Sequence, residues 1–222
     1  MSGADLAPLW LTLRLAALVT ALLLVLATPL AWWLARHRTR LTPVVEALTA
    51  LPLVLPPTVL GFYLLLAFNP QAPFGAFWLQ MTGTTLTFSF AGLVLASLIY
   101  SLPFAVQPLQ AVFSGLGPGP LEAAASLGAG RLDAFFTVAL PLSLRGYLTA
   151  AVLTFAHTLG EFGVVLMVGG NIPGQTRVIS IAIYEHVERI DYGAAHMLSG
   201  LLLALSFAIL LGLYGLNARG RA

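Results

Sequence analysis

The sequence predicts an all-α integral membrane protein with about five transmembrane helices, a helical loop on one side of the membrane and a short surface helix on the other. Of the 222 residues, 59% are hydrophobic and only 8% are charged, whereas soluble domains carry roughly 25% charged residues. The apolar residues form long blocks, unlike the short alternating strands of a membrane barrel. All the basic residues are Arg and cysteine is absent, which excludes disulfide scaffolds and thiol catalysis. The composition also excludes most soluble enzymes and nucleic-acid-binding domains.

The first expected span covers residues 11–34. Within it, Leu15–Leu34 carries no charge and has the length of about 20 residues that crosses a bilayer core. A cleaved signal peptide would place its basic residues before the apolar run. Here the basic cluster that begins at Arg36 follows the run, so we expect the helix to be retained. Trp32 and Trp33 beside this cluster are expected at the inner membrane interface.

Four further spans are expected within a single polytopic domain, residues 1–222. No residue between Glu46 and Glu122 is charged, a stretch long enough for two crossings, and turn-forming residues at 69–75 divide it. Two more apolar runs follow nearer the C-terminus. The expected spans after the first are residues 44–68, 84–106, 146–168 and 197–216.

The arginines predict the orientation. With the loop after the first span inside the cell, seven arginines lie on the cytoplasmic side and two outside, with Arg14 near the outer end of the first span. This asymmetry obeys the positive-inside rule. The N-terminus is therefore expected outside and the C-terminus in the cytoplasm. The inner arginines are Arg36, Arg38, Arg40, Arg131, Arg145, Arg219 and Arg221, and the outer ones are Arg177 and Arg189.

The expected periplasmic loop, residues 169–196, contains a segment that is apolar on one face. This segment, 178–189, is charged on its other faces. Such a pattern is typical of a helix that lies along the membrane surface. A sixth, short membrane helix is the alternative.

The loop between the third and fourth spans, residues 107–145, is long for a small transporter. The breaker cluster Gly115–Pro120 is expected to end the preceding helix, and Pro120 suits the first turn of a new one. From Leu121 the Ala-rich run is typical of a helix, with Glu122 in the first turn, where the helix dipole favours an acid. A glycine and a second apolar turn follow, which predicts an L-shaped docking element.

The same loop resembles the EAA loop of permease subunits of ABC importers. That pattern runs Glu-Ala-Ala, three residues, Gly, nine residues, Ile-x-Leu-Pro. It is matched here by Glu122, Ala123, Ala124, Gly128, Val138, Leu140 and Pro141, with Val138 for Ile as the only departure. The resemblance implies a coupling helix that docks into a cleft of a cytoplasmic ATP-binding subunit. Small Ala side chains would let two backbones approach, and Gly128 would permit a close turn where a Cβ would collide.

Other stretches resemble the molybdate transport permease family and its close sulfate relatives. They are Leu51–Gly61, Leu159–Gly163 and Gly169–Thr176, and the resemblance extends over about residues 10–216. It implies an inner-membrane permease for an oxyanion, most closely molybdate or tungstate, with sulfate or thiosulfate as the alternative. It also implies a second copy of the chain, two ATPase subunits that bind ATP and Mg²⁺, and a soluble periplasmic binding protein. The chain itself has no Lys for a phosphate-binding loop, and we expect it to hold no catalytic residue, cofactor, metal or nucleic acid.

Three prolines, Pro52, Pro56 and Pro57, lie inside the second expected span. Each removes a backbone hydrogen bond and forces a bend or an unwound stretch, which a membrane tolerates only where protein or water covers the freed carbonyls. A broken helix that lines a pathway and a simple packing kink both fit this pattern. Thr58 could satisfy a freed group in either case.

Four polar residues recur at helical spacing in the fourth expected span: Thr154, His157, Thr158 and Glu161. They predict one polar face, which should contact protein or a water path rather than lipid. His157 and Glu161, four positions apart, could hydrogen-bond to each other. We expect Glu161 to be structural, because its carboxylate would repel an oxyanion. The alternatives are a proton relay of a secondary transporter, and an intramembrane enzyme in which Ser97 or Ser101 acts with His157.

Overall fold

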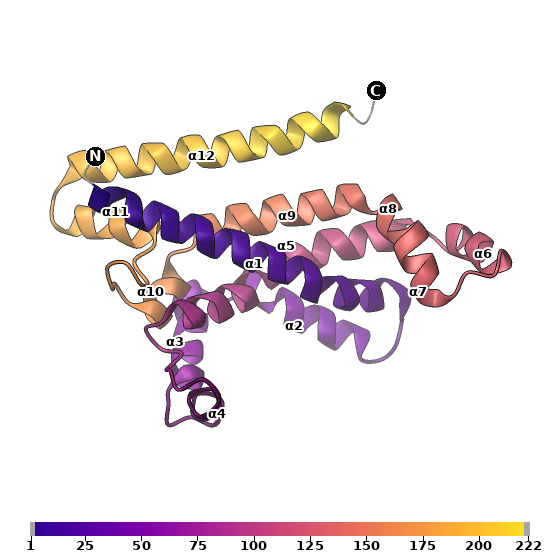
Figure 1. The fold of residues 1–222 in the computed structure, drawn as a ribbon, viewed down its shortest axis with the longest axis horizontal. Helices are drawn as coiled ribbons and strands as arrows, with labels where there is room; N and C mark the ends of the chain where they lie inside the picture. Colours follow the sequence, from indigo (N-terminus) through magenta and orange to yellow (C-terminus); the bar gives the residue numbers. More distant parts are fainter. Residues whose placement is uncertain (1–2, 220–222) are drawn as a thin grey trace.

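The computed structural model describes residues 3–219, and every regular element in this range is a helix (Figure 1). The elements are α1 (Gly3–Arg36), α2 (Thr42–Val54), α3 (Pro57–Phe68), α4 (Pro73–Thr82), α5 (Phe90–Gly115), α6 (Gly119–Ser126), α7 (Arg131–Ala134), the π-helical turn η1 (Phe135–Ala139), α8 (Leu140–Leu142), α9 (Leu144–Leu159), α10 (Gly163–Gly169), α11 (Ile179–Glu188) and α12 (Tyr192–Arg219). Three of these helices, within Ala7–Arg36, Phe90–Gly115 and Tyr192–Gly212, are long and apolar enough to cross a membrane. The predicted all-α membrane fold is therefore confirmed.

The centre of the molecule is the packing of α1, α5 and α9 against one another. Along α1 a buried residue recurs every four positions, from Leu15 and Val19 to Ala31, so these residues share one face. The opposite face is also apolar, and Val25 there is 71% exposed. A helix exposed to water would be polar on that face. The outer face of α1 is therefore suited to lipid.

Two bent helix pairs could supply further crossings. The pair α2 and α3 bends by 112° at Leu55–Pro56, and the pair Arg131–Leu142 and Leu144–Leu159 bends by 70°. Leu55 and Pro56 both have extended backbone, with ψ of 135°, because a residue before proline is pushed out of the helical region. As a result α3 leaves the direction of the bundle and projects sideways, with α4 at its far end (Figure 1).

The third expected span, 84–106, has different ends in the structure. Helix α5 begins only at Phe90, where the side chain of Ser89 accepts a hydrogen bond from the backbone N–H of Gly92. Phe88 before it has a φ of 59°, which interrupts a helix. At the other end α5 continues beyond residue 106 to Gly115. The first part of the expected loop 107–145 is thus helix, and the chain leaves it at the breaker cluster.

The segment of the fourth expected span, 146–168, is divided between two helices in the structure. Helix α9 ends at Leu159, Gly160 caps it, and Phe162 has φ of −132° before α10 begins at Gly163. Two glycines within four residues lower the helix propensity of this stretch. The polar face expected over 154–161 is therefore interrupted, because Glu161 lies in the break and the other three residues lie on α9.

The two ends of the molecule are formed by different parts of the chain (Figure 1). The start of α1, α11 and the start of α12 gather at one end, and α6 and α7 lie at the other. Helix α11 falls within the segment 178–189 expected to be interfacial. It is tied to α1 by a hydrogen bond of 2.8 Å from the backbone N–H of Ile179 to Oγ1 of Thr12.

Candidate functional site

The loop between α5 and α9 forms a two-legged projection, here called the coupling segment, residues 116–143. Its first leg, α6, starts with Pro120 in the first turn. It ends at a turn in which the N–H of Gly128 donates to the carbonyl of Ala125 and the N–H of Ala129 donates to that of Ala124, each at 3.0 Å. These two bonds form a Schellman motif, which requires a left-handed residue at Gly128. Gly128 has a φ of +89°.

The structure gives a different reason for a glycine at position 128 from the one expected. A Cβ at Gly128 would have no heavy atom within 4 Å, so no collision inside the chain requires Gly at this position. The left-handed backbone requires it instead, because L-residues with a side chain adopt that conformation at a cost of roughly 1–2 kcal/mol. The turn at Gly128 is present as expected, and a collision of a Cβ with other residues of the chain is not its cause.

The second leg of the coupling segment runs through α7, η1 and α8. The helix widens at Phe135–Ala139, where the N–H of Leu140 bonds to the carbonyl of Phe135. Pro141 follows directly. It has no N–H and its ring would clash with the carbonyl of residue 137, which accounts for the wider turn at this point. The 70° bend between α8 and α9 then directs the chain back into the bundle.

The motif residues of the two legs meet at one hollow, here called the coupling hollow. It has a volume of about 500 Å³. Its lining includes Ala123, Ala124, Gly128 and Val138. Leu127, which also lines it, is 90% exposed, and Leu132 of α7 is 76% exposed. Apolar side chains exposed together at the tip of a projection are typical of a protein contact surface.

The remaining motif residues lie on the same segment. Glu122 is exposed on α6 and makes no ion pair within residues 3–219. Leu140 is half-buried and Pro141 is exposed at α8. The spacing of the motif thus places its first half on one leg and its second half on the other.

Aromatic packing fixes the coupling segment to the bundle. Phe135 contacts Trp32 of α1 edge to face, with ring centroids 5.0 Å apart, and Trp32 in turn contacts Phe113 of α5 at 5.1 Å. Phe113 is fully buried. Such aromatic pairs stabilise by about 0.5–1.5 kcal/mol beyond area burial. Trp32 therefore joins three elements, a role that a simple interface anchor would not have.

A second cavity, here called the break cavity, lies where the two interrupted helices meet. Its volume is about 600 Å³, and residues from α3, α5, α9, α10 and the break after α9 line it. The helices approach closely: a Cβ on Gly163 would lie 2.7 Å from Cβ of Pro57, and one on Gly61 would lie 2.8 Å from Cβ of Met167. The polar and titratable side chains that line it are those of Thr58, Tyr100, His157 and Glu161.

Glu161 is held by the neighbouring helices. Its side chain is 4% exposed, and Oε2 accepts a hydrogen bond of 2.7 Å from Ser97 of α5. Its carbonyl accepts a hydrogen bond from Ser180 of α11. The other carboxylate oxygen, Oε1, has no partner among the described residues. The residue thus ties the break to α5 and to α11.

His157 does not contact Glu161 as the spacing suggested. The break removes Glu161 from the helix, and His157 Nδ1 instead lies 2.9 Å from Oγ of Ser101. The ring stacks on Phe104, with centroids 4.0 Å apart. Ser101 is fully buried and its hydroxyl also bonds to Thr158. A serine with both partners fixed and no exposed surface is poorly placed to attack a substrate, so the geometry favours a structural role over the enzyme alternative.

The other pathway residues are spread around this cavity. Pro57 and Thr58 line it, Pro56 is the residue before α3, and Pro52 lies buried within α2. Thr154 is fully buried one turn away from the cavity lining. The side chain of Thr58 makes no hydrogen bond within residues 3–219. Ser97 and Ser101 were considered only as formal nucleophiles, but in the structure they bond to Glu161 and His157. Their spacing of four residues on an apolar helix could have indicated a shared polar face.

Comparison with known proteins places the chain in a family. The sequence matches the family described as binding-protein-dependent transport system inner membrane component over residues 27–220. The chain is 56% identical over 214 residues to the molybdenum transport system permease protein ModB of Azotobacter vinelandii, covering 96% of this chain and 95% of that protein. It is 36% identical over 185 residues to ModB of Escherichia coli K12, covering 82% and 81%. It is 35% identical over 190 residues to the sulfate transport system permease protein CysT of the same strain, covering 86% and 68%.

The fold is also found among solved structures. A chain in a structure of the MetNI methionine ABC transporter in inward-facing conformations matches with a TM-score of 0.72, covering 97% of both chains at 18% identity. At this identity the likeness concerns the fold alone. Together with the family match over most of the chain, these findings mean that the protein belongs to the inner membrane components of binding-protein-dependent transport systems.

Proposed function

We propose that the chain is the membrane subunit of an ATP-driven importer of molybdate, and that it forms the pathway for the ion. The 56% identity to a molybdenum transport permease, over nearly the full length of both proteins, carries this proposal. Tungstate has the same tetrahedral form and charge and belongs to the same substrate class. Sulfate is the second candidate, because a sulfate permease is 35% identical to the chain.

The break cavity is the proposed part of the pathway. Helix α3 begins at Pro57 on the cavity wall, so the positive end of its dipole lies there, which favours an anion. Thr58 offers a hydroxyl for a hydrogen bond to an oxyanion. Glu161 is proposed to have no direct part in binding the cargo, because its carboxylate would repel an anion. Its proposed role is to hold the helices together through the bond of one oxygen to Ser97.

The coupling segment is the proposed contact with the energy source. The proposed assembly has two ATPase subunits, which would bind ATP and Mg²⁺. Each would dock on one copy of the chain, at the coupling hollow and at the exposed Leu127 and Leu132. Their closure would move this segment, and Phe135 would pass the movement to α1 and α5 through its contacts with Trp32 and Phe113. The ATPase can bias the pathway toward one conformation only if its contacts with the membrane subunit differ between the two conformations.

A second copy of the chain and a periplasmic binding protein complete the proposed assembly. Phe62 and Tyr63 on α3 are largely exposed, and α3 projects from the bundle (Figure 1). One copy with this shape would not enclose a pathway, whereas two copies would. The binding protein would deliver the anion at the end of the molecule formed by α1 and α11, with the N-terminus outside and the C-terminus in the cytoplasm.

Uptake by the reconstituted complex tests the proposal. The chain would be co-expressed with candidate ATPase and binding-protein partners and placed in vesicles. We expect ATP-dependent uptake of molybdate, with competition by tungstate and little by sulfate. Preferential sulfate uptake would move the assignment to the sulfate class. Uptake driven by a proton gradient without ATP would contradict the importer mechanism.

A further inference from the structure

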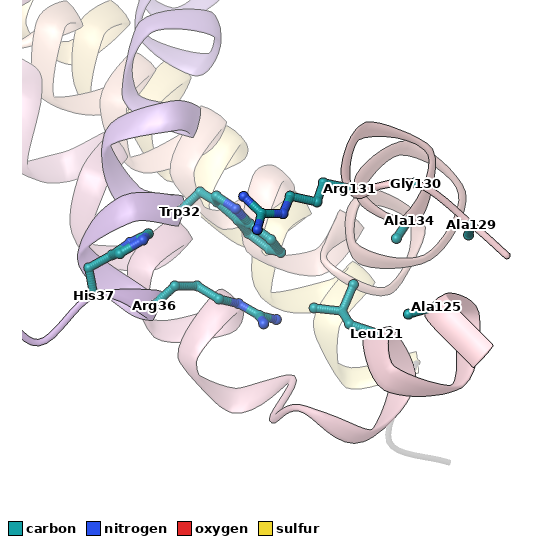
Figure 2. Close-up of a pocket in the computed structure, with 9 residues that line it drawn as sticks. All are labelled: Trp32, Arg36, His37, Leu121, Ala125, Ala129, Gly130, Arg131 and Ala134. Carbon is teal, nitrogen blue, oxygen red and sulfur yellow. The ribbon is translucent and has the colours of Figure 1, made fainter. Parts of the chain in front are cut away.

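A third cavity lies between the inner end of α1 and the coupling segment, and it is here called the α1 pocket. Its volume is about 470 Å³. Leu121 and Ala125, which line it, lie on a different face of α6 from Ala123 and Ala124, which line the coupling hollow. Figure 2 shows its residues. The α1 pocket and the coupling hollow share Ala129, but the other residues that line the two cavities are different.

The polar groups of this pocket are basic. Arg36 is the last residue of α1, His37 follows it, and Arg131 belongs to α7. The guanidinium groups of Arg36 and Arg131 both reach into the space between α1 and the coupling segment (Figure 2). Like charges that converge in this way repel each other unless an anion lies between them.

No acidic side chain of the chain balances these groups in the described residues. No carboxylate lines the pocket, and neither Arg36 nor Arg131 has an ion pair within residues 3–219. The nearest acid in sequence, Asp133, lines the coupling hollow instead. The guanidinium of Arg36 lies over the ring of Trp32 in a cation–π arrangement, 4.5 Å from its centroid. The arrangement therefore has space and charge for an anionic group from outside the chain.

The rest of the lining indicates which anion fits. The ring of Trp32 and the side chains of Leu121, Ala125 and Ala134 are apolar. A free oxyanion would leave these walls without a partner, whereas the glycerol and first methylenes of a phospholipid would cover them. Trp32 lies at the inner end of a membrane-length helix, at the depth where aromatic residues meet headgroups. Basic pockets between helices on the cytoplasmic side suit anionic headgroups.

We propose that the α1 pocket binds the phosphate of an acidic phospholipid, such as phosphatidylglycerol, between Arg36 and Arg131. One arginine belongs to the bundle and the other to the coupling segment, so a bound headgroup bridges the two. The lipid would then hold the coupling segment in position against α1. This last consequence rests on the proposed function, but the binding of the lipid does not.

Retention of lipid by the purified complex tests the site. The complex would be extracted into detergent with equal amounts of phosphatidylglycerol and phosphatidylcholine, and the lipid that stays bound would be counted by native mass spectrometry. Wild type should retain phosphatidylglycerol in preference. Arg36→Gln and Arg131→Gln should each weaken retention about fivefold, which corresponds to about 1 kcal/mol per basic residue. Arg40→Gln is the matched control, because Arg40 is exposed in the loop between α1 and α2 and does not line the pocket.

Three results would overturn the proposal. Equal retention by wild type and both pocket variants would mean that the arginines bind no lipid. Binding of inorganic phosphate or molybdate that depends on both arginines, without competition by phosphatidylglycerol, would assign the pocket to a free oxyanion. Loss of the ATPase from the pocket variants with unchanged lipid retention would assign the arginines to that partner. Because no transport is measured, failure of the importer assignment would not change these readings.

Discussion

Gly128 has the left-handed backbone that ends the first helix of the coupling segment. Ala at this position would have to adopt a φ near +89°, at a cost of roughly 1–2 kcal/mol. We predict that Gly128→Ala weakens ATPase association about fivefold or more, because the docking conformation becomes less populated. Gly128→Asn should restore part of the loss, since Asn tolerates the left-handed region.

Gly130 supplies the control for this prediction. It also has no atom within 4 Å of a Cβ, but its φ is −70°, which any residue adopts. Gly130→Ala should therefore associate like wild type when the ATPase is co-purified and its affinity measured. Equal behaviour of the two Ala variants would show that the left-handed turn has no part in docking.

Glu161 yields a second prediction at this scale. In Glu161→Gln an amide oxygen can still accept the hydrogen bond from Ser97, so ATP-dependent uptake should persist. Glu161→Ala leaves the Ser97 hydroxyl buried without a partner, and the free energy of unfolding should fall by about 1–3 kcal/mol. Thermal unfolding of the purified complex and uptake with and without a proton gradient measure the two effects. Abolished uptake in the Gln variant with normal ATP hydrolysis would support a proton relay.

The contact between α3 and α10 is the element on which the break cavity depends. A Cβ on Gly163 would lie 2.7 Å from that of Pro57, closer than two such atoms approach without movement of the backbone. We predict that Gly163→Ala separates the two helices and lowers uptake severalfold with normal membrane insertion. Gly200→Ala is the control, because an added Cβ there would have no heavy atom within 4 Å and Gly200 does not line the break cavity, so this variant should transport normally.

Residues at the element breaks explain which parts of the fold could be predicted. The prolines at positions 56 and 57 predicted a break because they lack an N–H, and that chemistry is local. The break after Leu159 was not predicted, because two glycines in an apolar run lower helix propensity by only about 1 kcal/mol each. Its stability depends on tertiary bonds, from Ser97 to the side chain of Glu161 and from Ser180 to its carbonyl.

For the whole molecule we predict the N-out, C-in orientation. The chain has no native cysteine, so single cysteines can be placed without competing thiols. An impermeant reagent added outside should label Gln71→Cys and Gly174→Cys and should not label Gly117→Cys until the membrane is opened. The reverse pattern would invert every statement of sidedness, including the position of the α1 pocket.

The sites formed by residues far apart in the sequence were the hardest to predict. The residues of the proposed coupling motif lie within one short stretch of sequence, so their spacing could be recognised without the fold. The α1 pocket joins Arg36 to Arg131, and the contact of Ser101 with His157 joins α5 to α9. Neither pair has a sequence pattern, because residues so far apart meet only when the helices pack.

The packing of α1 also bears on the order in which the protein is made. Helix α1 leaves the ribosome before its main partners α5 and α9, and α9 is complete only when the chain has reached Leu159. Until then, the face that carries Leu15 and Val19 lies against lipid, which is as apolar as the core it awaits. Thr12 near its outer end meanwhile bonds to the carbonyl of Pro8 within the same helix. The helix can therefore wait in the membrane with the Thr12 hydroxyl already paired within it, and the bundle closes around it late in translation.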